Sequence, residues 1–135
     1  MEEQVVPRDT TVASDLADVE TTLRMYFDGM YEGDIDKLSE AFHLQSHLYN
    51  IVDDKAVAKP VNDWYDIVRK RTSAASVSHE RTDRILTIDF NGPAIAFAKV
   101  EGSRPQVDFT DYLTLLKVGG RWQIIAKVFR METRQ

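Results

Sequence analysis

The fold of this chain is decided by the stretch Phe109-Thr-Asp-Tyr-Leu-Thr-Leu-Leu-Lys-Val-Gly-Gly-Arg-Trp-Gln-Ile-Ile-Ala-Lys-Val-Phe129. Two apolar, β-prone runs flank Gly119-Gly120, and glycine tolerates the positive φ angles of a tight hairpin turn. A two-residue turn predicts the cross-strand pairs Val118–Arg121, Leu115–Ile124, Leu113–Ala126 and Asp111–Val128. The stretch therefore predicts a long β-hairpin with a defined register.

Asp111 is the first candidate functional residue in this hairpin. Side chains alternate between the faces of a strand, and the register gives Asp111 an apolar face made of Leu113, Leu115, Trp122, Ile124, Ala126 and Val128. The other face holds Tyr112, Thr114, Leu116, Ile125, Lys127 and Phe129. An apolar environment raises the pKa of a carboxyl group, which is how general acids and bases are prepared. The alternative is a structural carboxylate that accepts a hydrogen bond from the backbone or from Tyr26.

The residues before the hairpin alternate between helical and extended patterns. Apolar residues recur at helical spacing in three segments, at 15–32, 35–42 and 60–71. Gly33 ends the first helix, Asp34 caps the second and Pro60 fits the first turn of the third. Further strands are expected at 47–52, 55–58, 84–90 and 94–101, the last two joined by the hairpin turn Asn91-Gly92.

This order predicts an α+β fold with three N-terminal helices packed on a strongly bent antiparallel sheet. Residues 1–14 lack periodicity and are expected to be a disordered tail, and residues 15–135 to form a single domain. Extending the register places Phe97 and Phe109 on the Asp111 face and puts Ala96 and Ala98 on the opposite face. The large side chains would then line a concave surface that closes over the helices.

Composition narrows the classes of function. The chain has 135 residues, no cysteine and a net charge of −5, and 43% of its residues are hydrophobic. The acidic balance argues against nucleic acid and anionic membranes as partners, and no apolar run is long enough to span a bilayer. The absence of cysteine excludes disulfides and thiolate sites. We expect a soluble, cytoplasmic protein that uses no cofactor, because phosphate loops and nucleotide fingerprints are missing.

Two stretches resemble the nuclear transport factor 2-like superfamily. The first is Tyr26-Phe-Asp-Gly-Met-Tyr-Glu-Gly-Asp34 at the end of the long helix, and the second is the hairpin from Asp111 to Ile125. Within that superfamily the chain looks most like the branch labelled putative lumazine-binding, near the SnoaL-like cyclases. The resemblance covers nearly all of the chain after residue 14 and implies a cone-shaped fold. That fold hosts enzymes, carriers and dimerisation modules, so it does not imply one activity.

The ketosteroid isomerases of this superfamily use a helix-borne tyrosine, a strand-borne acid and a separate carboxylate base. By that resemblance Tyr26 matches the tyrosine and Asp111 lies on the strand of the hydrogen-bonding acid. The position of the base is Asn50, and an amide cannot accept a proton at neutral pH. The resemblance therefore implies that the steroid-isomerase mechanism is not intact.

Other candidates are weaker. His43 is a possible acid or base partner in the pocket, and its spacing from His47 would suit a metal only if both lay on one helix; we expect no metal. Trp64 and Trp122 are expected in the core or the pocket wall. The candidate catalytic residues are Asp111, Tyr26 and His43. The candidate ligand-binding residues are Tyr26, Asn50, Trp64, Phe97, Asp111, Leu113, Trp122 and Val128.

Three functions remain open from the sequence. The first is an apolar pocket that binds a small hydrophobic or aromatic molecule. The second is a metal-independent proton-transfer enzyme, an isomerase, dehydratase or cyclase, acting in the same pocket. The third is a dimerisation module without catalysis. In each case we expect a homodimer through the convex face of the sheet, where apolar side chains would otherwise meet water, namely Tyr112, Leu116, Ile125 and Phe129.

Overall fold

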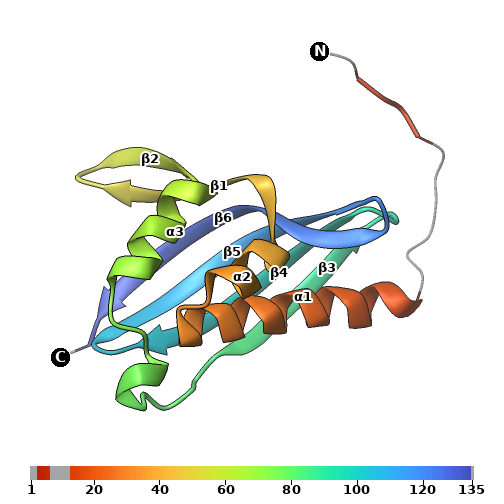
Figure 1. The fold of residues 1–135 in the computed structure, drawn as a ribbon. Helices are drawn as coiled ribbons and strands as arrows, with labels where there is room; N and C mark the ends of the chain where they lie inside the picture. The colour runs from red at the N-terminus through yellow and green to blue at the C-terminus, as the bar shows by residue number, and fades with distance from the viewer. Residues whose placement is uncertain (1–2, 7–12, 135) are drawn as a thin grey trace.

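Three helices cover one face of a single six-stranded sheet in a computed structural model of the chain (Figure 1). The structure describes residues 3–6 and 13–134. The helices are α1 (Ala13–Glu32), α2 (Ile35–Ala41) and α3 (Val61–Lys70), with a short 3-10 helix η1 (Ala75–Val77). The strands are β1 (Phe42–Val52), β2 (Lys55–Pro60), β3 (Arg84–Asn91), β4 (Ile95–Arg104), β5 (Val107–Val118) and β6 (Arg121–Thr133). The predicted α+β class is confirmed.

The helix ends follow the local sequence. Asp34 caps α2, and its side chain accepts a hydrogen bond from the Lys37 backbone amide at 3.2 Å. Gly33 separates α1 from α2 with a φ of 68°, which glycine adopts without steric cost. Helix α1 begins at Ala13, slightly before the predicted start, and residues 7–12 of the expected tail lie outside the described part of the chain.

The sheet has the order β2-β1-β6-β5-β4-β3. Strand β1 runs parallel to β6, and all the other neighbours are antiparallel. The sheet is therefore mixed, although the sequence predicted an antiparallel one. The difference arises because the β1–β2 hairpin joins the free edge of the hairpin formed by β5 and β6, a long-range pairing that local turn signals do not specify.

A β-bulge in β6 corrects the predicted register. The pairs Val118–Arg121 and Leu115–Ile124 are confirmed, but Thr114 pairs with Ala126, so Ile125 is an extra residue. Beyond it the true pairs are Leu113–Lys127 and Asp111–Phe129, and the predicted pairs Leu113–Ala126 and Asp111–Val128 are wrong. A one-residue bulge moves every later side chain to the other face. Lys127 and Phe129 therefore face the helices, and Val128 faces outward.

The turn between β4 and β5 corrects a second prediction. The strands continue to Arg104 and resume at Val107, so the turn holds two residues instead of five. Ala96 and Ala98 consequently face the helices beside Asp111, and Phe97 faces outward, where its ring packs against Tyr112 at a centroid distance of 5.8 Å. The predicted placement of Phe97 on the Asp111 face is wrong.

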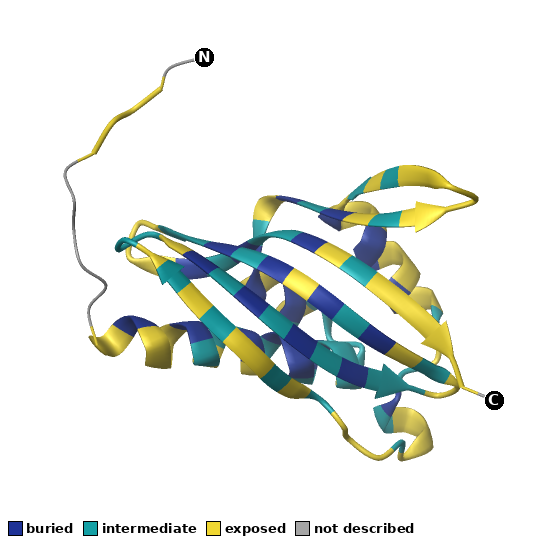
Figure 2. Cartoon of the chain, turned by 180° about the vertical axis from the view of Figure 1, so that it is seen from behind, coloured by how far each residue is buried: buried dark blue, intermediate teal, exposed yellow. Residues whose placement is uncertain are grey.

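The core lies between the helix layer and the inner face of the sheet. The buried residues of α3 are the four expected from its spacing, Val61, Trp64, Tyr65 and Val68. Figure 2 shows the opposite face of the sheet, which no helix covers; along its central strands buried positions alternate with half-buried or exposed ones. Within the described residues, no helix is long and apolar enough to cross a membrane.

Candidate functional site: a cationic cavity around Asp111 and Lys127

A cavity of about 280 Å³ lies between α3, the β1–β2 hairpin and the inner face of β5 and β6. Its apolar wall consists of Met30, Leu48, Val52, Val57, Trp64, Ile67, Phe109, Phe129 and Met131. Its polar wall consists of Asn50, Lys59, Arg71, Arg104, Asp111 and Lys127. A mostly apolar cavity with a few convergent polar groups is the usual form of a small-molecule site.

The Asp111 carboxyl, in the wall of this cavity, forms a buried pair with the Tyr26 hydroxyl. Both residues are 0% exposed, and the Tyr26 hydroxyl donates to Asp111 Oδ2 at 2.5 Å. The second oxygen, Oδ1, is buried and has no hydrogen-bond partner among the described residues. Burial raises the pKa of Asp111, and the charge of Lys127 and the hydrogen bond from Tyr26 oppose that rise. Burial and the nearby carboxylate also raise the pKa of Tyr26.

Lys127 is a buried cation in the same cavity, and the sequence analysis did not identify it. Its side chain is 3% exposed. Its ammonium lies over three aromatic rings, 5.1 Å from the centroid of Tyr26, 4.5 Å from Trp64 and 5.0 Å from Phe129. Burial lowers the pKa of Lys127 to about 8, against an opposing effect of the Asp111 charge and with further lowering from the neighbouring arginines. The bulge at Ile125 is the reason that sequence alternation assigned this residue to the outer face.

Two arginines complete the positive wall. Arg71 follows α3 and Arg104 ends β4, and burial lowers the pKa of each guanidinium. Each donates to a thioether sulfur, Arg71 to Met30 at 3.7 Å and Arg104 to Met131 at 3.6 Å. Neither arginine, nor Lys127, takes part in an ion pair within residues 3–6 and 13–134.

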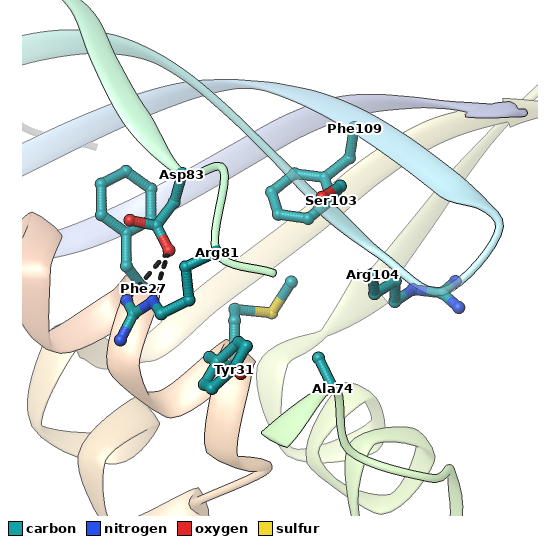
Figure 3. Close-up of a pocket in the computed structure, with 9 residues that line it drawn as sticks. Phe27, Tyr31, Ala74, Arg81, Asp83, Ser103, Arg104 and Phe109 are labelled. Atoms are coloured by element: carbon teal, nitrogen blue, oxygen red, sulfur yellow. Dashed lines mark hydrogen bonds and ion pairs between the residues drawn. The ribbon is translucent and has the colours of Figure 1, made fainter. Parts of the chain in front are cut away.

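Arg81, near Arg104, differs from it in being paired with carboxylates. Figure 3 views a smaller cavity of about 20 Å³, where Arg81 pairs with Asp83 and Arg104 points away from that pair. Arg81 also pairs with Asp28 at 2.9 Å and lies over the Tyr31 ring at 4.8 Å. The charge of Arg81 is therefore balanced by carboxylates, whereas that of Arg104 is not. Although the chain carries a net charge of −5, the larger cavity is locally positive.

A family model described as putative lumazine-binding matches residues 14–130. The chain belongs to this family. Its sequence is 26% identical over 113 residues to a protein of Cladobotryum sp. named aldolase FrzH, covering 84% of this chain and 88% of that protein. Two crystal structures of nuclear transport factor 2-like proteins of unknown function are similar. The one from Shewanella baltica has a TM-score of 0.82 and 25% identity over 93% of this chain and 100% of that one. The one from Methylobacillus flagellatus has a TM-score of 0.80 and 28% identity over 94% and 100%. The predicted superfamily is confirmed.

The remaining predicted site residues of this putative lumazine-binding family member lie in different places. Asn50 and Trp64 line the cavity, as Asp111 does. Leu113 is buried on the same face but does not line the cavity. Val128 is 51% exposed on the outer face, as the bulge requires, so its predicted place in the pocket is wrong. Phe97 is likewise outside the pocket.

His43 lies away from the cavity. It is on β1, directly after α2, and its Nδ1 accepts a hydrogen bond from the Gln45 backbone amide at 3.0 Å. His43 is not among the residues that line the cavity. In the described ranges no group of three or more histidine, aspartate or glutamate side chains is arranged to hold a metal ion.

Trp122 belongs to a second buried polar cluster rather than to the cavity wall. Its indole N–H donates to Asp15 Oδ1 at 3.0 Å, and Lys117 donates to the same oxygen at 3.0 Å. Asp15 is 0% exposed. The cluster joins the first turn of α1 to the β5–β6 hairpin, so its role is to fix the helix on the sheet.

Proposed function

We propose that the cavity binds a small molecule that has a flat apolar body and an anionic group. The observation that carries this proposal is the convergence of Arg71, Arg104 and Lys127 on one apolar-walled cavity, where Asp111 supplies the single carboxylate among the described lining residues. Burying a cation without an ion-pair partner costs free energy, so an anion that enters the cavity stabilises the folded protein. The sequence predicted a small hydrophobic or aromatic ligand, and we now propose that this ligand also carries an acidic group.

The walls support two contacts for such a ligand. The ring of Trp64 and the side chains of Met30 and Ile67 offer an apolar surface for a planar body. Arg71 and Arg104 come from different elements and present guanidinium groups, which match the geometry of a carboxylate or a phosphate. Membership of a family described as putative lumazine-binding supports a planar ligand but does not name it.

Paired fluorescent probes test this proposal. Anilinonaphthalene sulfonate and phenylnaphthylamine share an aromatic body and differ by the sulfonate. We expect the sulfonate to bind more tightly to the wild type, and Arg71→Met and Arg104→Met to weaken its binding by at least about tenfold while leaving the neutral probe unaffected. Arg69→Met is the matched control, because Arg69 lies in the last turn of α3, two residues before Arg71, and pairs with Asp66 on the surface. Equal binding of both probes to the wild type would show that the cavity does not select anions.

A second function, proton transfer, is favoured by one further observation. Asp111 Oδ1 is buried without a partner in a wall of the cavity, while the Tyr26 hydroxyl holds the other oxygen. A carboxyl group held in this way is prepared to exchange a proton with a ligand. Aldol reactions begin with loss of a proton next to a carbonyl group, so the name of the Cladobotryum relative supports the same chemistry.

Solvent exchange tests the proton-transfer function directly. The methyl protons of para-acetylbenzoate, an aromatic carboxylate with an enolisable ketone, are followed by NMR in deuterated buffer. We expect the wild type to accelerate their exchange and Asp111→Asn to abolish the acceleration while the anionic probe still binds. Exchange that continues in the variant would exclude Asp111 as the base.

We also propose a homodimer through the outer face of the sheet. Three apolar side chains on β4, β5 and β6 support it: Ile95 is 46%, Tyr112 48% and Val128 51% exposed. Tyr112 and Val128 are cross-strand partners and form one patch, and Ile95 lies farther along the same face, opposite Leu116. The patch differs from the predicted one because Phe129 points inward and Val128 takes its place.

A further inference from the structure

We propose that Lys127 is a nucleophile that forms an imine with the carbonyl group of a small molecule bound in the cavity. This inference rests on the proposed function, because it requires that a ligand enters the cavity. It adds a covalent step and a substrate class, an aldehyde or ketone that also carries an anionic group.

The surroundings of the Lys127 amine support this role. The amine is nearly excluded from water, lies in the wall of a cavity of about 280 Å³ and contacts ring faces rather than a carboxylate. Lys117, which is also partly buried, instead forms an ion pair with Asp15 at 3.0 Å. A lysine kept only for structure would be expected to have such a partner. The Lys127 amine is therefore available to a ligand.

The electrostatic environment favours the reactive form of the amine. Only a neutral amine has the lone pair that attacks a carbonyl carbon, and lysines become neutral when they are desolvated or placed near other cations. Lys127 has both features, since it is buried and faces Arg71 and Arg104. The pKa of Lys127, lowered to about 8, agrees with this geometry.

The bond-forming step balances without a further reactant. The Nζ lone pair of the neutral amine attacks the carbonyl carbon, and one N–H proton passes to the carbonyl oxygen to give a neutral carbinolamine. The Asp111 carboxyl, which lines the same cavity, then gives a proton to the carbinolamine hydroxyl, which leaves as water. The product is a protonated imine, in which the carbon–nitrogen double bond replaces the carbon–oxygen double bond, beside the Asp111 carboxylate.

The neighbouring Asp111 carboxylate can act as a base on the imine. A protonated imine makes the adjacent C–H bond acidic, and the Asp111 carboxylate can accept that proton to leave a neutral enamine. Tyr26 holds Asp111 in place through Oδ2, so Oδ1 is the atom that receives the proton. An enamine is the carbon nucleophile of aldol-type bond formation. Tyr26 is a positioning residue in this scheme, and Lys127 and Asp111 are the catalytic residues.

Reductive trapping tests the proposal. The probe is para-formylbenzoate, which has an aromatic body, a carboxylate and an aldehyde, and cyanoborohydride reduces any imine to a stable amine. At about pH 8 an ordinary lysine is almost entirely protonated whereas about half of Lys127 is neutral, so Lys127 should be labelled about a hundredfold faster. Intact-mass and peptide mass spectrometry measure the rate and the site of labelling.

Three variants make the outcome decisive. Lys127→Met should lose the fast label, and Lys127→Arg should lose it while keeping a cation in the cavity. Lys99→Met is the matched control, because the Lys99 ammonium lies 5.4 Å from the centroid of a ring, that of Tyr112, but on the outer face. It should retain the fast label. Circular dichroism melts establish that each variant is folded.

The two proposals fail in distinguishable ways. If the anionic probe binds to the cavity but the aldehyde labels all lysines at similar slow rates, the imine proposal is overturned and the binding proposal stands. If Lys127 is labelled fast but the neutral and anionic probes bind equally, the imine proposal stands and selection of anions is overturned. A fast label that persists in both Lys127 variants also contradicts the imine.

Discussion

Tyr26 and Asp111 lie 85 positions apart in the chain, and the Tyr26 hydroxyl donates a 2.5 Å hydrogen bond to the buried Asp111 carboxylate. This bond ties the middle of α1 to the middle of β5 and leaves one carboxylate oxygen for the cavity. It therefore has both a structural and a chemical consequence, and each can be measured separately.

Replacing Tyr26 by phenylalanine should destabilise the fold by about 1–3 kcal/mol, because a buried carboxylate loses its donor. The pKa of Asp111 should rise further, since the lost bond lowers it. A carboxyl group with a raised pKa destabilises the folded state as pH increases through that pKa, so the deficit should be larger at neutral pH than at pH 4. Urea unfolding measures it. Tyr65→Phe is the control, as the Tyr65 hydroxyl makes only a 3.4 Å bond to Leu38; equal costs in the two variants would contradict the prediction.

Stability should also depend on Lys127 at alkaline pH. Its pKa is about 8 in the folded protein and near 10.5 when unfolded, so the unfolded chain binds more protons between these values. The free energy of unfolding should therefore rise with pH in this window, by up to about 3 kcal/mol for complete deprotonation. Urea titrations from pH 7 to pH 10 should show the rise in the wild type and in Lys99→Met, and not in Lys127→Met. A rise that persists in Lys127→Met would assign it to another group.

The charge of Asp111 should tune the reactivity of Lys127. The groups that face the Lys127 amine are Tyr26 on α1, Lys59 on β2, Arg71 after α3, Arg104 on β4 and Asp111 on β5. Asp111 is the one that raises the pKa of the amine when charged, so Asp111→Asn should lower that pKa below about 8. The rate of aldehyde labelling is measured over a range of pH for both proteins. The pH at the midpoint of this dependence should be lower for Asp111→Asn than for the wild type. An unchanged midpoint would mean that the two groups are not coupled.

Asp15→Ala should reduce stability without affecting the cavity. The substitution leaves the Trp122 indole N–H and the Lys117 ammonium without the carboxylate oxygen that both contact at 3.0 Å. We expect a loss of about 2–4 kcal/mol in urea unfolding. Asp18→Ala, an exposed position on the same helix, should cost little. Binding of the anionic probe should be unchanged, and weaker binding would show that the two polar clusters communicate.

The oligomeric state tests the outer face. Light scattering coupled to size exclusion should give twice the monomer mass of 15.5 kDa for the wild type. Val128→Glu places a charge within the apolar patch, beside Tyr112, and should give a monomer. Val77→Glu is the control, because Val77 is 52% exposed on η1, outside the sheet. A monomeric wild type at micromolar concentration would rule out this interface.

Local patterns predicted the fold well, because the features that define it are local. Apolar spacing identified the three helices, Asp34 identified a cap, and Gly119-Gly120 and Asn91-Gly92 identified two hairpin turns. The turn at Pro105-Gln106 was missed because Gln106 adopts a φ of 67°. Glycine or asparagine usually occupies such a position, so a glutamine there does not indicate a tight turn. Strict alternation then failed at the β4–β5 turn and at the bulge, where one residue more or less reverses the faces.

The candidate site was predicted in part. Asp111 was found because a lone carboxylate in an apolar run stands out, and the superfamily resemblance supplied Tyr26. Lys127 was missed because of the bulge, and Arg71 because a cation at the end of a helix already has an explanation in the helix dipole. One signal was present in the sequence. Trp122 and Phe129 are seven positions apart, so a regular strand cannot place both large aromatic side chains on the inner face.

The bulge at Ile125 also has a consequence for how the protein folds. From the glycine turn to Leu115, the two strands of the hairpin pair in a regular register. Beyond that point two alignments compete, one regular and one with the bulge at Ile125. The regular alignment hides Ala126 and leaves the Lys127 amine in water, so it requires less desolvation while the sheet is still bare. The bulged alignment becomes favourable when Tyr26 and Trp64 arrive to surround the amine. We therefore expect docking of the helices to commit the lysine to the interior, and the half of the hairpin beyond the bulge to form last.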